Sequence, residues 1–92
     1  MIIMQKMTIH PGLIIKSYLT QGQISSSFAA QKMGMHASQF CDILNGKRDL
    51  NSRVALLLEQ EFGYSARELM HLQAEYDLEK ERNLLTKQGL LP

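Results

Sequence analysis

The sequence has little of several features that mark specialised classes of protein. It holds one cysteine, Cys41, among 92 residues, so an internal disulfide framework is excluded. Two prolines and six glycines exclude collagen-like and low-complexity chains. The longest apolar runs, residues 1–4 and 54–58, fall far below the roughly 18 residues of a membrane span, and we find no signal-peptide pattern. These absences predict one small, cytoplasmic, globular domain with a modest core.

The net charge of +1 conceals an uneven distribution of charge along the chain. Residues 1–58 carry six lysines and arginines against two aspartates, a net charge of +4, whereas residues 59–92 carry four against seven acidic residues, a net charge of −3. Such a division suits one face that binds a polyanion and another that binds a basic partner. The alternative is a chance distribution of solvated charges.

Apolar residues recur at three- and four-residue spacing through most of the chain, which is typical of amphipathic helices. Pro11 suits a first helical turn, Ser25, Asn51 and Ser65 suit N-caps, and Glu68 completes a capping box with Ser65. The pattern predicts five helices, running from residue 11 to 21–23, from 25 to 34, from about 36 to 45–46, from 51 to 63, and from 65 onward. No competing strand pattern is present after the first nine residues, so we expect an all-α domain.

The second and third predicted helices match a helix-turn-helix. Two helices that cross steeply need a small residue where they touch, and Ala30 supplies it. The turn needs a residue that tolerates positive φ, and Gly34 supplies it. Phe40 and Ile43 provide the buried side of the second helix, which leaves its other side available to enter a groove in a partner.

Three flanking segments make a family resemblance recognisable: IHPG at residues 9–12, LNGKR at 44–48 and LQAEYDL at 72–78. With the helix-turn-helix, they closely resemble the HigA-type antitoxins, which are Cro-type helix-turn-helix proteins also known as plasmid-maintenance antidote proteins. The resemblance implies a five-helix fold like that of Cro and the lambda repressor. It also implies a small dimeric repressor, without enzymatic activity, that binds its own promoter and neutralises a ribonuclease toxin encoded in the same operon.

This resemblance also suggests how the chain is organised. We expect a helix-turn-helix domain over residues 8–78, an N-terminal arm over residues 1–7, and a polar helical extension with a frayed C-terminus over residues 79–92. The apolar arm could pack on a dimer mate or on a toxin. The acidic second half favours a basic partner, and a ribonuclease needs a basic surface to hold RNA.

The predicted groove-facing residues contain no arginine or lysine. They are His36, Ala37, Ser38, Gln39 and Asp42. Arginine and lysine make the commonest specific contacts to guanine, so this surface reads DNA weakly or in an unusual way. Gln39 can pair with adenine, and Asp42 can accept a hydrogen bond from cytosine. The neutral surface also keeps open a rival function, a protein-interaction module on a helix-turn-helix scaffold, and a stand-alone repressor is a further alternative.

Basic and polar residues follow the recognition helix, where a Cro-type domain meets the sugar-phosphate backbone. Asn45, Lys47 and Arg48 are expected to contact phosphates, and Arg53 and Lys32 to extend that basic rim. The alternative is that Asn45 and Gly46 simply end the helix, with the cations complementing its dipole.

At the start of the second helix, Ser25 and Ser26 complete the predicted DNA-binding set. Ser26 stands where the family often has a phosphate-binding glutamine.

No other chemistry is indicated. The three histidines and Cys41 lack the spacing of a metal site, so we expect neither a metal nor a cofactor. We interpret Cys41 as a small packing residue on the flank of the buried stripe. The serines at 25–27 lack a legible base to activate them as nucleophiles.

Overall fold

The structure, a computed structural model, describes residues 8–92. The predicted arm at residues 1–7 lies outside the described residues. Five α-helices form the described chain, and none of it is in a strand. They are α1 (Pro11–Gln21), α2 (Ser26–Lys32), α3 (Ala37–Leu44), α4 (Ser52–Phe62) and α5 (Ala66–Lys87). The prediction of five helices in an all-α domain is therefore confirmed.

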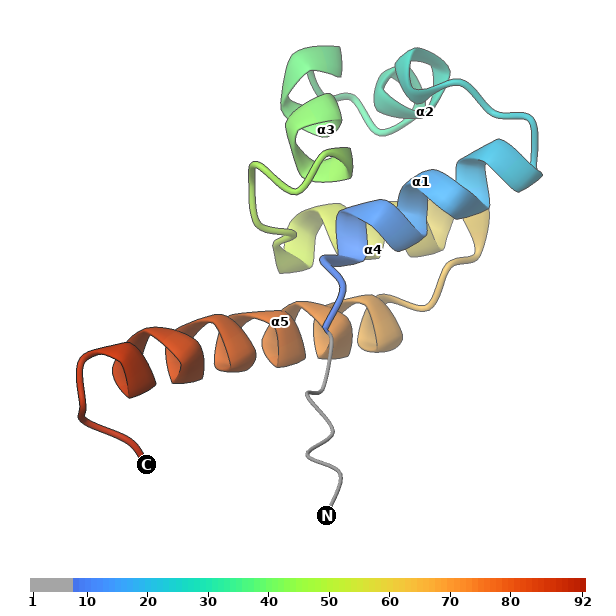
Figure 1. The fold of residues 1–92 in the computed structure, drawn as a ribbon. Helices are drawn as coiled ribbons and strands as arrows, with labels where there is room; N and C mark the ends of the chain where they lie inside the picture. The colour runs from blue at the N-terminus through green and yellow to red at the C-terminus, as the bar shows by residue number, and fades with distance from the viewer. Residues whose placement is uncertain (1–7) are drawn as a thin grey trace.

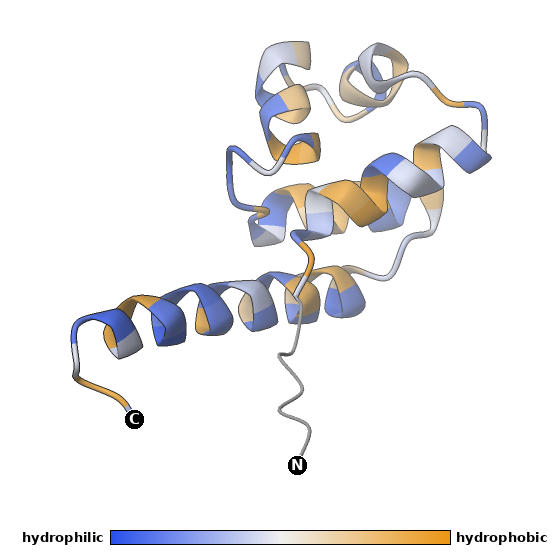
Figure 2. Ribbon diagram, in the orientation of Figure 1, coloured by the Kyte–Doolittle hydropathy of each residue, from blue (hydrophilic) through white to orange (hydrophobic). Residues whose placement is uncertain are grey.

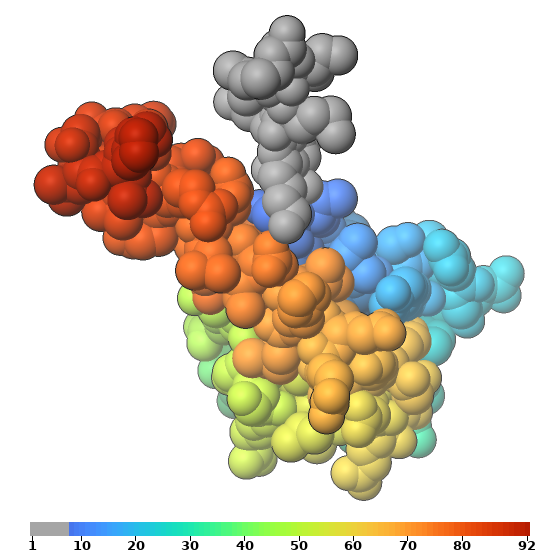
Figure 3. Space-filling model, turned by 90° about the horizontal axis from the view of Figure 1, so that it is seen from below, coloured from blue at the N-terminus to red at the C-terminus, as the bar shows by residue number. Residues whose placement is uncertain are grey.

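The helices form three tiers (Figure 1). The short helices α2 and α3 lie on one side, α1 and α4 lie in the middle, and the long α5 lies on the opposite side. Hydrophobic residues gather where α1, α3 and α4 face one another, while much of α5 is hydrophilic (Figure 2). Seen from below, α5 runs across the body and its last turns extend beyond it (Figure 3).

Local signals in the sequence begin the helices as expected. The side-chain oxygens of Ser25, Asn51 and Ser65 each accept a backbone N–H three residues ahead, at 3.1, 2.9 and 3.2 Å. Glu59 of α4 reaches the start of α5, where its Oε2 accepts the Ala66 N–H at 2.8 Å. At the other end of α5, the Leu90 N–H donates to the Leu85 carbonyl at 2.9 Å, just beyond the last helical residue, Lys87.

The core joins the helix-turn-helix to the other helices. Its largest fully buried apolar side chains are Phe40, Ile15, Ile43, Leu50, Leu58 and Leu69. Burying a side chain of this size stabilises a fold by roughly 1.5–3 kcal/mol. Ala30 is buried and Gly34 adopts a φ of +67°, in agreement with the helix-turn-helix pattern.

Gly12 lets α1 and α3 approach more closely than any side chain would allow. A Cβ atom added at Gly12 would lie 1.7 Å from the Ile43 carbonyl oxygen, a separation that real atoms do not reach. The first turn of α1 therefore lies directly against the backbone of the recognition helix. Among residues 8–92, no helix is both long and apolar enough to cross a membrane.

Candidate nucleic-acid interface

The predicted recognition helix, α3, has one buried and one exposed side. Phe40, Ile43 and Leu44 are buried, whereas the residues at its N-terminus are exposed: His36, Ala37, Ser38 and Gln39. Asp42 is only partly exposed, and it lies on the margin between the two sides. The exposed side therefore presents small and neutral polar groups.

Our interpretation of Cys41 as a packing residue is wrong. Its side chain is exposed, and its Sγ accepts a hydrogen bond from the Asn45 amide at 3.4 Å. Cys41 lies one turn before Leu44, at the edge of the buried stripe, and the neighbouring helices do not cover that edge.

A basic loop, residues 45–50, follows α3. Asn45, Lys47 and Arg48 are exposed in it. The Asp42 carbonyl accepts the backbone N–H groups of Lys47 and Arg48, at 2.8 and 3.2 Å, so the chain turns tightly against the end of α3. Gly46 permits this turn with a φ of +76°. The two cationic side chains thus leave the same tight turn.

Gln73 of α5 fixes the other end of the basic loop. Its side chain is only 3% exposed, and its Oε1 accepts the Leu50 N–H at 2.8 Å. Its Nε2 donates to Asp49 Oδ1 at 3.3 Å and to Asp77 Oδ1 at 2.9 Å. The buried Gln73 amide therefore pairs with the Leu50 N–H of the loop and orients the carboxylates of Asp49 and Asp77.

His10 supports the loop from the start of α1. Its Nδ1 accepts the Gly12 N–H at 2.9 Å and so caps α1, and its ring meets Tyr76 of α5 edge-on at a centroid distance of 5.0 Å. The ring also lies beside Gly46, within 3.6 Å of the position that a Cβ would take there. The IHPG and LQAEYDL segments, far apart in the sequence, thus meet around the basic loop.

Burial lowers the pKa of His10 below its ordinary value of 6.5. The nearby Asp49 carboxylate, the backbone of Arg48 and the Asp77 carboxylate oppose this effect, whereas Lys80 adds to it. The neutral ring is the form that can accept the Gly12 N–H and hold the start of α1 in place.

The remaining predicted residues lie at the edges of this surface. Ser25 caps α2, and Ser26 opens it in a partly buried position. Arg53 is exposed in the first turn of α4, where it lines the same hollow as Arg48 and Gln39. Lys32 instead lies 4.0 Å from the Glu61 carboxylate of α4, so part of its charge is neutralised within the chain.

Sequence reasoning missed the residues that hold the basic loop in place. His10 and Gln73 were noted only as members of the IHPG and LQAEYDL segments that carry the family resemblance. Their contacts with the loop were not predicted, because the local sequence pattern does not show which distant residues a side chain meets. In the described part of the chain, no group of three or more histidine, cysteine, aspartate or glutamate side chains is arranged to hold a metal ion.

Known proteins resemble this chain in sequence and in structure, although no protein-family model matches it. Virulence-associated protein A′ of Dichelobacter nodosus is 39% identical over 70 residues, which are 75% of this chain and 61% of that protein, so the chain spans less than two thirds of this relative. The antitoxin HigA of Pseudomonas aeruginosa, solved with the higBA promoter, has a TM-score of 0.82 and 31% identity, over 89% of this chain and 90% of that one. An addiction module antidote protein of a HigA family from Coxiella burnetii has a TM-score of 0.81 and 27% identity, over 90% and 91%.

The lowered pKa of His10 predicts how stability depends on pH. Because the native pKa lies below 6.5, the unfolded chain binds a proton first as the pH falls. The contribution of His10 is complete above about pH 6.5 and disappears between there and the native pKa. Urea unfolding at pH 7.5 and pH 5 should show a larger loss of stability for the parent than for His10→Asn, whose amide oxygen can still cap α1 but does not titrate. Equal losses in the two proteins would show that His10 does not carry the effect.

Proposed function

Because this chain belongs to the HigA family of antitoxins, we propose that it is a sequence-specific DNA-binding repressor of its own promoter and the antitoxin of a toxin–antitoxin pair. Its role is regulatory rather than enzymatic, and it acts in the cytoplasm, where the promoter is accessible. The observation that carries the proposal is the likeness to HigA of Pseudomonas aeruginosa, solved with the higBA promoter, over about nine tenths of both chains. The exposed side of α3 beside a fixed basic loop supports it.

In our proposal, one group of residues supplies the affinity for DNA and another supplies the sequence specificity. Phosphate contacts position a protein on DNA and supply most of the affinity, whereas contacts to base edges supply sequence information. In our proposal Asn45, Lys47, Arg48 and Arg53 bind phosphates, and the exposed start of α3 enters the major groove.

Base reading in this proposal rests on neutral groups. Gln39 is exposed and can pair with adenine, and Ala37 offers an apolar contact to a thymine methyl group. Asp42 is partly covered, which leaves it less able to accept a hydrogen bond from cytosine. His36 and Ser38 complete the base-reading set, while Ser25 and Ser26 place the start of α2 near the DNA backbone.

We further propose that the protein acts as a homodimer and that its second partner is a basic ribonuclease toxin. The acidic side chains of α5 favour such a partner by charge complementarity: Glu75, Asp77, Glu79 and Glu81. The gene context tests this part separately. A neighbouring gene for a small ribonuclease supports it, and an isolated gene would leave a stand-alone repressor.

The neutral side of α3 is the one observation that favours a different function, a protein-interaction module without specific DNA binding. The following measurement decides between the two.

The parent protein should bind its own upstream DNA more tightly than a random duplex of equal length. Typical ratios for specific binding reach about 10³ or more. Fluorescence anisotropy titrations of both duplexes at one fixed salt concentration measure the ratio. Equal affinity for the two duplexes would refute the repressor and favour the interaction module.

Removing the charges of the basic loop should weaken binding to every sequence alike. Lys47→Ala with Arg48→Ala should reduce the slope of log K against log salt by about 0.9 for each phosphate that the variant no longer neutralises, because fewer counterions are released. A matched control, Arg67→Ala with Lys87→Ala, removes the same charge from exposed positions of α5 and should keep the parent slope. If the two double variants show the same slope, the basic loop does not lie on the phosphates.

A further inference from the structure

Asn45 and Gly46 form a chemically reactive pair where α3 ends and the basic loop begins. An asparagine followed by glycine loses its side-chain amide more readily than other asparagines, because glycine has no Cβ to hinder attack by its own backbone nitrogen. The chain contains this pair once, since Asn51 precedes a serine and Asn83 precedes a leucine. Asn45 is exposed, so water reaches it.

The reaction, deamidation, needs water as its only co-reactant. The Gly46 nitrogen attacks Asn45 Cγ and gives up its proton, the bond from Cγ to Nδ2 breaks, and Nδ2 leaves as ammonia. Water then opens the resulting cyclic succinimide at either of its carbonyl groups. One product is aspartate, and the other is isoaspartate, in which the backbone runs through the side chain. No atom is oxidised or reduced.

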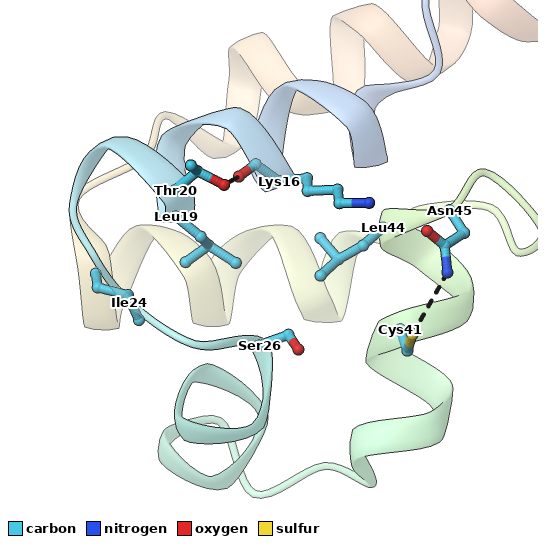
Figure 4. A pocket seen from close by; sticks show the side chains of 8 residues that line it. All are labelled: Lys16, Leu19, Thr20, Ile24, Ser26, Cys41, Leu44 and Asn45. Atoms are coloured by element: carbon cyan, nitrogen blue, oxygen red, sulfur yellow. Dashed lines mark hydrogen bonds between the residues drawn. The ribbon is translucent and has the colours of Figure 1, made fainter.

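The folded structure holds the reacting groups of this pair apart. Ring closure requires the Asn45 Cβ and the Gly46 nitrogen to be nearly eclipsed about the Cα–C bond. The ψ angle of Asn45 is 5°, which eclipses the Gly46 nitrogen with the Asn45 nitrogen instead. The Gly46 N–H also donates to the Ile43 carbonyl at 3.1 Å, and Asn45 Nδ2 donates to Cys41 Sγ at 3.4 Å (Figure 4). Both groups are therefore engaged elsewhere.

Moving these groups into position requires the turn after α3 to come apart. A rotation about the ψ angle of Asn45 swings Gly46 and Lys47 away from the end of α3. It breaks the bond from Gly46 to Ile43 and the bond from the Lys47 N–H to the Asp42 carbonyl, which is 2.8 Å long. The hydrogen bonds of the turn therefore resist the rotation that ring closure needs.

Contacts from α5 and from the start of α1 hold the same turn in place. The His10 ring lies within 3.6 Å of the position that a Cβ would take at Gly46, so the turn has little free space on that side. Gln73 of α5 accepts the Leu50 N–H at 2.8 Å and fixes the other end of the loop. The reactive pair is thus part of a loop that is held from both sides.

We propose that Asn45 is a deamidation site that stays unreactive while the basic loop is closed and reacts when the loop opens. The reaction is irreversible, so it ends the DNA binding of the protomer in which it occurs. This second part rests on the proposed function, whereas the reaction and its control by the loop do not.

The product alters the basic loop in two ways. A carboxylate at residue 45 lies at the C-terminal end of α3, where the helix dipole disfavours a negative charge. It also lies in the same loop as Lys47 and Arg48, and it repels the phosphates that these cations are proposed to bind. In isoaspartate, an additional methylene lengthens the backbone inside the turn that the Asp42 carbonyl holds.

The first test measures the rate of deamidation at Asn45 by peptide mass spectrometry after incubation of the full chain in mildly alkaline buffer. The folded parent should react at least about tenfold more slowly than the same chain unfolded in urea. Gln73→Ala, which leaves the buried Leu50 N–H without its partner, should react at least about fivefold faster than the folded parent. The exposed control Gln60→Ala should match the parent.

A measurement on the parent alone keeps the test decisive if Gln73→Ala does not fold. Below the urea concentration of the unfolding transition, the deamidation rate of Asn45 should rise in parallel with the hydrogen-exchange rate of the Leu50 amide. Equal deamidation rates in the folded and the unfolded parent would overturn control by the loop. A deamidation rate that does not follow the exchange of Leu50 would overturn it as well.

The effect on DNA is measured on deamidated protein, which anion exchange separates from unreacted protein by its additional negative charge. In anisotropy titrations it should bind the upstream duplex at least about fivefold more weakly than the unreacted protein. Asn45→Gln, whose longer side chain closes a ring far more slowly, should keep after ageing the affinity that it had when fresh.

The outcomes separate this inference from the proposed function. Deamidated protein that binds as tightly as unreacted protein would overturn the inactivation, while the repressor stands. If unreacted protein shows no preference for the upstream duplex, the proposed function fails together with the inactivation, and the deamidation rates still decide whether the loop protects Asn45.

Discussion

The hydrogen bond from the Leu50 N–H to the Gln73 side chain is the contact on which the DNA-facing geometry depends. It joins the loop after α3 to a helix on the opposite side of the domain, and it is made by an amide that is only 3% exposed. Leaving a buried backbone N–H without a partner costs about 1–3 kcal/mol, so the loop has a strong preference for this position. His10 supports the same loop from the other side, through its place beside Gly46 and its edge-on contact with Tyr76.

This arrangement supports the proposed DNA binding by a recognition helix that carries no cation. The fixed basic loop supplies charge at the end of α3, and the close approach at Gly12 fixes that helix against α1. In the proposed function, cations at the edges of the surface supply the affinity for DNA, and neutral side chains at its centre discriminate among bases without adding much to non-specific binding. Helix α5, which carries the acidic residues of the second half of the chain, lies on the opposite side of the domain from α2 and α3 (Figure 1).

The sequence predicted those features whose causes are local. Caps such as Ser25 and Asn51 act within three residues, and buried positions such as Phe40 and Ile43 follow from helical periodicity. Contacts between distant segments could not be predicted this way, because periodicity shows that Gln73 lies on a helix but not that it meets Leu50. The burial of Cys41 was predicted wrongly for a related reason. Cysteine is usually a buried, apolar residue, but only the packing of the neighbouring helices decides whether a position beside the buried side of α3 is covered.

The central claim is that α5 holds the basic loop in the position that DNA binding requires. Amide hydrogen exchange and DNA affinity, measured together on Gln73→Ala and on the exposed control Gln60→Ala, test it most directly. We expect Gln73→Ala to exchange the Leu50 amide faster and to bind every duplex more weakly, while the amides of Ile43 and Leu44 in α3 stay protected and Gln60→Ala behaves like the parent. A Gln73→Ala protein with a rapidly exchanging Leu50 amide and unchanged DNA affinity would contradict the claim.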